Sequence, residues 1–159
     1  MSKDRYIRLI EEFCRLSKLD QPARIVEGGA VEFDGVPFSL LYSAKINPDA
    51  LLIYCEFGTP PLGREADAYR ILLQMNFSRY DGNGGQTFTL SPATGKILCA
   101  SRLNLEQAKA QELHDLLAKI AEQAKQWRQD YRMGVQPLPD RALHHARRPG
   151  RFSNAGPQR

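Results

Sequence analysis

Hydrophobic side chains recur every three or four residues near both ends of the chain, and this spacing predicts a helix at each end. The first helix covers residues 4–18, with Asp20 and Pro22 ending it, and one of its sides carries Tyr6, Leu9, Ile10, Phe13 and Leu16. The last helix covers residues 105–131, with Asn104 as its N-cap and Gln107 at the capping-box position.

Alternating or continuous apolar runs after the first helix predict three strands. Residues 30–34 and 37–43 alternate, whereas residues 51–57 are almost continuously apolar, as in a strand at the centre of a sheet. Asp34 and Gly35 are typical of a two-residue hairpin turn. The run from Asn47 to Asp49 predicts a second turn, so the three strands most simply form an antiparallel meander.

The middle of the chain predicts a helix followed by a hairpin. Residues 65–76 place Ala68, Ile71, Leu72 and Met75 on one helical face. A glycine-rich segment at residues 81–85 ends that pattern, and it lacks the spacing of a phosphate-binding loop. Residues 87–90 and 96–103 then read as two strands joined by a tight connection from Pro92 to Gly95.

The predicted order is helix, three strands, helix, two strands and helix. We therefore expect an α+β fold with a mostly antiparallel five-stranded sheet and three helices. The length of 159 residues suits one domain, which we assign to residues 1–133. Residues 134–159 contain four prolines and few aliphatic side chains, so we expect a disordered tail there.

The formal net charge of +4 comes from this tail. Residues 137–159 contain five arginines against the single acid Asp140, so the preceding residues have equal numbers of basic and acidic side chains. A basic tail can keep a protein soluble, or it can bind nucleic acid, lipid or an acidic protein surface. The tail therefore leaves a nucleic-acid-binding function open, although the domain itself has no RNA-binding aromatic motif.

Catalytic equipment is missing from the sequence. Cys14, Cys55 and Cys99 lie far apart in apolar runs and form no CxxC pair, which predicts free buried thiols in a reducing compartment. His144 and His145 lie in the predicted tail without a cluster of cysteines or carboxylates. We expect no enzyme activity, no cofactor and no metal site. The chain has no apolar run long enough to cross a bilayer and no secretory signal pattern, so we expect a soluble protein.

The ordered set of elements resembles the class I type III secretion chaperones, the Tir-chaperone family. The resemblance covers residues 4–132 and rests on the apolar first helix, the strand pair split at Asp34 and Gly35, and residues 51–57. It continues through residues 71–77 (ILLQMNF), Gly84 and Gly85, residues 87–90 and the final amphipathic helix. Family members are usually acidic, whereas this domain is neutral with a basic tail.

The resemblance implies a non-catalytic homodimer in the cytoplasm of a bacterium with a type III secretion system. Such a dimer binds the N-terminal segment of an effector in extended form, keeps it competent for secretion and helps deliver it to the export ATPase. A related dimer with a structural or regulatory role outside secretion is the alternative, and the identity of neighbouring genes would separate the two.

Two sets of residues follow as candidate contacts. We expect the client to bind the first helix and the outward faces of the first strands, through Leu9, Phe13, Leu16, Val31, Phe33 and Phe38. The resemblance places the dimer contact on the second predicted helix and the strand after it, through Ile71, Leu72, Met75, Phe77, Phe88 and Leu90.

Overall fold

A computed structural model of the protein describes residues 1–79 and 85–131. Four helices and five strands follow one another in the order α1 (Ser2–Ser17), α2 (Pro22–Val26), β1 (Ala30–Phe33), β2 (Val36–Ser43), β3 (Asn47–Gly58), α3 (Glu65–Arg79), β4 (Thr87–Leu90), β5 (Ile97–Asn104) and α4 (Ala110–Asp130). This is the α+β architecture expected from the sequence, with one additional short helix. The predicted tail at 134–159, with His144 and His145, lies outside the described residues.

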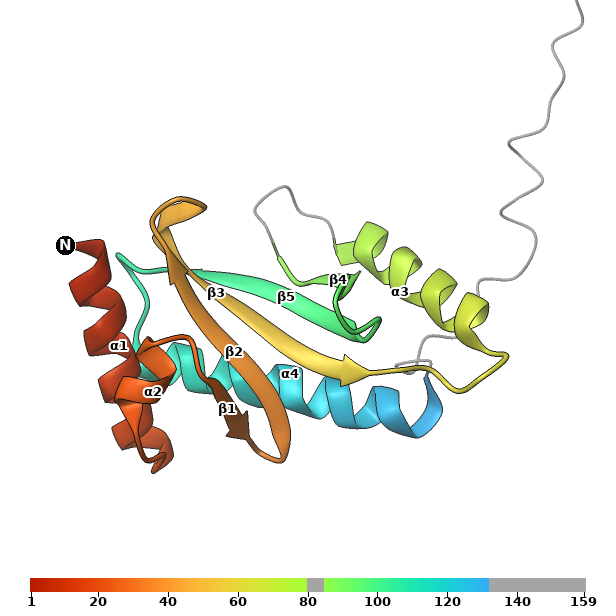
Figure 1. The fold of residues 1–159 in the computed structure, drawn as a ribbon, viewed down its shortest axis with the longest axis horizontal. Coiled ribbons are helices and arrows are strands. Elements are labelled where there is room, and N and C mark those ends of the chain that lie inside the picture. Colours follow the sequence, from red (N-terminus) through yellow and green to blue (C-terminus); the bar gives the residue numbers. More distant parts are fainter. Residues whose placement is uncertain (80–84, 132–159) are drawn as a thin grey trace, which may run out of the picture.

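The five strands form one sheet in the order β1-β2-β3-β5-β4, and every neighbouring pair is antiparallel. Figure 1 shows α4 running behind the sheet, with α1 and α2 at one end and α3 beside β4 at the other. The sheet thus has one face covered by helices and one face turned away from them. Among the described residues, no helix is long and apolar enough to span a membrane.

The hydrophobic core lies between the sheet and the two long helices. Alternate side chains of β3, namely Leu51, Ile53, Cys55 and Phe57, are fully buried, because successive residues of a strand point to opposite faces. Full burial of such an apolar side chain stabilises the fold by about 1.5–3 kcal/mol. Tyr6 joins α1 to this core, and its single hydroxyl hydrogen is shared between the carbonyl oxygens of Leu40 (3.0 Å) and Ile25 (3.2 Å).

Two of the three predicted connections within the sheet, at Asp34–Gly35 and at Pro92–Gly95, are present. Asp34 (φ 52°) and Gly35 (φ 72°) both adopt the left-handed conformation that a two-residue hairpin turn requires. This turn sets the register that pairs Phe33 with Val36 and Val31 with Phe38. In the second connection, the Ser91 N–H donates to the Lys96 carbonyl oxygen at 2.9 Å and closes the loop from β4 to β5.

The predicted end of the first helix is confirmed, because α1 ends at Ser17, but Pro22 begins a further short helix, α2, that was not predicted. A proline suits the first turn of a helix, where its missing N–H is not needed. Two other local predictions were wrong. The last helix begins at Ala110 with Lys109 as its N-cap, whereas Asn104 uses its side chain to accept the Glu106 N–H in a local turn. The second turn precedes Asn47, which is already part of β3.

Candidate partner-binding surfaces

Most of the side chains predicted to contact a client belong to the core. Leu9, Phe13, Val31, Phe33 and Phe38 are each at most 9% exposed, whereas Leu16 is 45% exposed. The register of the strands explains the low exposure of the strand residues, because Val31 pairs with Phe38 and both point to the face of the sheet that the helices cover. A partner that binds the folded surface cannot reach these five side chains, so of this set only Leu16 remains available.

The outward face of the first strands carries a different set of residues. Leu41 pairs with Leu52, and Ser39 pairs with Tyr54, so these side chains point away from the helices. Leu41, Tyr54 and Leu98 are half-buried there and form the apolar part of a shallow groove. We call it the sheet groove; it measures about 360 Å³, and its lining includes Ala30, Pro37, Ser39, Leu41, Tyr54, Glu56 and Leu98.

The two edge strands of the sheet, β4 and β1, differ in the hydrogen bonding of their backbone groups. At the β4 edge, the Asn76 side chain accepts the Phe88 N–H at 2.7 Å and donates to the Phe88 carbonyl oxygen at 2.9 Å. At the β1 edge, Pro37 stands opposite Glu32 and has no N–H to donate. The backbone polar groups of Glu32 therefore face away from β2, toward the open side of β1.

The predicted dimer residues all lie on α3 and β4. Some of them are buried within the single chain, and others are exposed on its surface. Leu72, Met75 and Phe88 are buried within the single chain, and Ile71 is half-buried. Phe77 (87% exposed) and Leu90 (46% exposed) lie on the surface.

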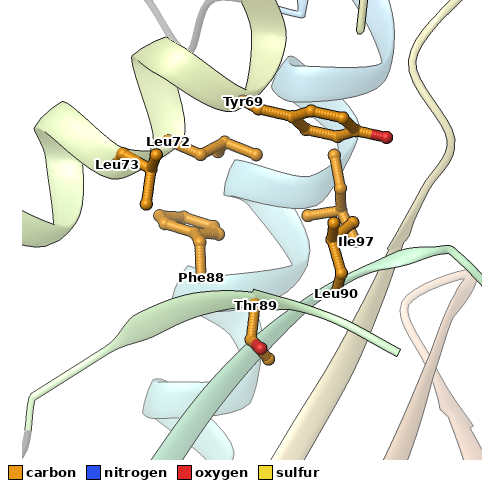
Figure 2. A pocket seen from close by; sticks show the side chains of 7 residues that line it. All are labelled: Tyr69, Leu72, Leu73, Phe88, Thr89, Leu90 and Ile97. Carbon is orange, nitrogen blue, oxygen red and sulfur yellow. The ribbon is translucent and has the colours of Figure 1, made fainter. Parts of the chain in front are cut away.

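An apolar groove of about 460 Å³ separates α3 from β4 and β5 (Figure 2). Figure 2 shows Leu72 and Phe88 between the helix and the strand, with Tyr69 reaching over Ile97 and Leu90. Tyr69 and Leu73 also line this groove but were not among the predicted contact residues, and Leu73 is 66% exposed. Leu73 lies four residues from both Tyr69 and Phe77, so these three side chains form a second apolar stripe along α3. This spacing could have predicted the additional contact residues from the sequence.

The cysteines have the properties of core residues. All three are free and buried, and burial raises the pKa of the Cys99 thiol to about 12. Burial raises the pKa of the Cys14 and Cys55 thiols as well. A thiol held in its neutral form is a poor nucleophile. Within residues 1–79 and 85–131, no group of three or more His, Cys, Asp or Glu side chains is arranged to hold a metal ion.

Comparisons with known proteins identify relatives of the whole domain. The model of the Tir chaperone protein (CesT) family matches residues 8–128. No curated protein sequence matches the chain.

Three solved complexes contain a chain with the same fold. The Yersinia pestis type III secretion chaperone SycH, bound to a stable fragment of YscM2, has a TM-score of 0.55 at 23% identity and covers 76% of this chain and 98% of its own. The ExsC–ExsE complex gives 0.59 at 21% identity, covering 81% and 95%. The HopA1–SchA chaperone–effector complex gives 0.62 at 18% identity, covering 81% and 97%.

Proposed function

The chain belongs to the Tir chaperone protein (CesT) family, and on this premise we propose that it is a cytoplasmic homodimer that binds the N-terminal segment of one or more effectors. The family consists of non-catalytic, effector-binding chaperones of type III secretion. In our proposal the chaperone holds this segment in extended form, keeps it competent for secretion and delivers it to the export ATPase.

The observation that carries the proposal is the sheet groove, which lies on the face of the sheet that no helix covers. Leu41, Tyr54 and Leu98 present apolar surface there, and the groove is open enough to accept side chains of an unfolded segment. Binding of this kind needs apolar pockets and main-chain hydrogen bonds but no catalytic group. We assign the client contacts to these outward residues, together with Leu16, in place of the buried side chains of the first strands.

The free edge of β1 supports an extended conformation of the client. The outward-facing N–H and C=O groups of Glu32 offer the pairing that an added strand requires. At the β4 edge, by contrast, the Asn76 side chain already occupies the N–H and C=O groups of Phe88. An effector segment added beside β1 would extend the sheet next to the sheet groove.

The surface of α3 supports a homodimer. Leu73, Phe77 and Leu90 are large apolar side chains with high exposure. Leu73 and Leu90 line the apolar groove between α3 and β4, and Phe77 follows Leu73 by about one helical turn. Contiguous exposed apolar surface of this kind marks an interaction site. We propose that a second copy of the chain covers it, with the two α3 helices in contact.

Co-purification with an effector tests the proposed function. Genes adjacent to that of the chaperone supply the candidate effectors, and each N-terminal segment is co-expressed with tagged chaperone. We expect Leu41→Glu and Tyr54→Glu to weaken binding by about tenfold or more, because each would place a charge in an apolar contact. Thr87→Glu is the matched control, since Thr87 is exposed on the same face outside the sheet groove.

The same thermal midpoint in all three variants would assign the loss to the binding surface rather than to unfolding. Equal binding by the two groove variants and the wild type would refute the assignment of the sheet groove. Failure of every adjacent effector candidate to co-purify would refute the chaperone function itself.

A further inference from the structure

Two residues of the edge strand β1 turn their backbone polar groups toward its open side. Residue pairs of antiparallel strands alternate between those that exchange backbone hydrogen bonds and those that do not. Glu32 stands opposite Pro37, which has no N–H to donate, and Ala30 lies two residues away in the same phase of this alternation. The N–H and C=O groups of Ala30 and Glu32 therefore face a strand that pairs along β1. Both side chains are exposed and point to the face of the sheet that no helix covers.

The sheet groove begins at this edge. Ala30 pairs with Ser39, and Ser39 pairs with Tyr54, so two small side chains lie between the edge and an aromatic ring. All three residues line the groove. A side chain that lies opposite Ala30 on an added strand has only a methyl group beside it. A large apolar side chain at this position would therefore bury apolar surface against the groove.

Glu32 gives the neighbouring position a different chemistry. Glu56, which lines the groove, accepts a hydrogen bond from Lys96 Nζ at 2.7 Å, so its charge is compensated within the chain. Glu32 instead lies on the edge strand itself and is exposed. Side chains that stand directly opposite each other on neighbouring strands have Cβ atoms about 4.5–5.5 Å apart, where opposite charges attract and like charges repel. A lysine or arginine opposite Glu32 thus favours binding, and an acidic residue there opposes it.

The direction of the strands sets the order of these two positions along a client. Every neighbouring pair in the sheet is antiparallel, and antiparallel pairing is slightly more stable per residue than parallel pairing. In an antiparallel strand, the residue opposite Glu32 precedes the residue opposite Ala30 by two positions. The residue between them stands opposite Val31 and points to the other face of the sheet.

We propose that the β1 edge selects client segments in which a basic residue is followed, two positions later, by a large apolar residue. The basic side chain pairs with Glu32, and the apolar side chain lies beside Ala30 in the sheet groove. Glu32 is then a specificity-determining residue. This inference rests on the proposed function, in which an extended effector segment is added beside β1.

An NMR titration of the isotope-labelled full chain tests the inference. The probe is a heptapeptide of threonines with lysine at the third position and leucine at the fifth, because threonine favours strands. A second peptide has glutamate in place of the lysine, and a third has the lysine and the leucine exchanged. The backbone amide signals of Ala30 and Glu32 report binding at the edge itself.

The lysine peptide should bind most tightly of the three. We expect it to bind at least about fivefold more tightly than the glutamate peptide, because an attraction is replaced by a repulsion, and this preference should decrease as salt rises. It should also bind at least about twofold more tightly than the exchanged peptide, which matches the two positions only in a parallel orientation.

A charge swap assigns the preference to one side chain. Glu32→Lys should reverse it, so that the glutamate peptide binds at least about fivefold more tightly than the lysine peptide. Glu122→Lys is the matched control, since Glu122 is exposed on α4, which runs along the other face of the sheet (Figure 1). It should change the preference by less than about twofold. A carboxylate that only protects the edge from aggregation would give no reversal.

Several results would overturn the inference. These are equal binding of the lysine and glutamate peptides, an unreversed preference in Glu32→Lys, tighter binding of the exchanged peptide, and amide signals of Ala30 and Glu32 that no peptide shifts. Signals that shift with protein concentration alone would show that a second copy of the chain occupies the edge, and they would overturn it as well.

Effector co-purification separates this inference from the proposed function. A chaperone that captures its effector but does not distinguish the peptides refutes only the client preference. A protein that shows the preference and its reversal but captures no effector refutes only the chaperone function.

Discussion

Asn76 and Phe88 are joined by a reciprocal pair of hydrogen bonds, in which one side-chain amide satisfies both backbone polar groups of a residue on the outermost strand. The amide takes the place that a neighbouring strand would otherwise occupy. Because α3 supplies it, the helix and the β4 edge are fixed relative to each other. Phe88 in turn packs against Phe57 with ring centroids 5.2 Å apart, so the contact reaches into the core.

Replacement of Asn76 by alanine tests this relationship. Asn76→Ala leaves the N–H and C=O of Phe88 without protein partners, and we expect the free energy of unfolding to decrease by about 1–3 kcal/mol. Gln74→Ala is the control, since Gln74 is exposed on the same helix, and it should change stability by less than about 0.5 kcal/mol. Chemical denaturation measures both, and equal stability of the two variants would show that the amide pair contributes nothing.

Adjacent residues of β2 should respond in opposite ways to the same substitution. Phe38 is 1% exposed and faces the helices, so Phe38→Asp should unfold the domain, because an unpaired charge in the core costs more than about 4 kcal/mol. Ser39 lines the sheet groove on the other face, so Ser39→Asp should leave the fold intact and weaken effector binding. Circular dichroism and co-purification distinguish the two outcomes, and a folded Phe38→Asp protein would contradict the register.

The dimer proposal predicts a folded monomer rather than an unfolded chain. Phe77 is 87% exposed, so Phe77→Asp disturbs no core contact but places a charge in the proposed interface. We expect native mass spectrometry at micromolar concentration to show a dimer for the wild type and a monomer for this variant. Leu16→Asp, a matched change on the exposed side of α1, should remain dimeric. A wild-type protein that is monomeric under these conditions would refute the homodimer.

The buried thiols predict a loss of stability at alkaline pH. The pKa of Cys99 is raised from 9.0 to about 12 by burial, so the folded state favours the neutral thiol. This contribution is fully present below pH 9 and is lost as the pH rises toward 12, since only the unfolded chain ionises in that range. Each such thiol should lower the free energy of unfolding by about 1.4 kcal/mol per pH unit there. Cys99→Ala should make this decrease shallower, whatever its effect at neutral pH; an unchanged slope would contradict the assignment.

The sequence was sufficient for every described element except the short helix α2, but not for the direction in which their side chains face. Alternation in β2 is visible from Phe38 to Tyr42, yet Leu41 on the opposite face is also apolar, so the pattern alone does not show which face the helices cover. The same ambiguity affects α3, where Leu72 is buried and its neighbour Leu73 is exposed. Only packing between elements distant in sequence resolves such cases.

Cap positions were uncertain for a local reason. Asn104 satisfies the sequence signature of an N-cap, but its side chain accepts the N–H of Glu106 within a turn that precedes the helix. Asparagine stabilises both arrangements, and the chain uses the additional turn to place Leu105 in the core before α4 begins at Ala110. The pair of hydrogen bonds from Asn76 to Phe88 had no sequence signal, since its partners lie on different elements.

The unequal edges of the sheet have a consequence for self-association. A sheet with two open edges can grow from both sides, and repeated growth of this kind produces fibres. In this chain the β4 edge is occupied at Phe88 by a side-chain amide, and the open β1 edge carries the exposed charge of Glu32. Addition of a strand at Phe88 would have to displace this amide, so the β1 edge is the more accessible one. A protein built in this way can hold an unfolded, strand-forming polypeptide without acting as a seed for its aggregation.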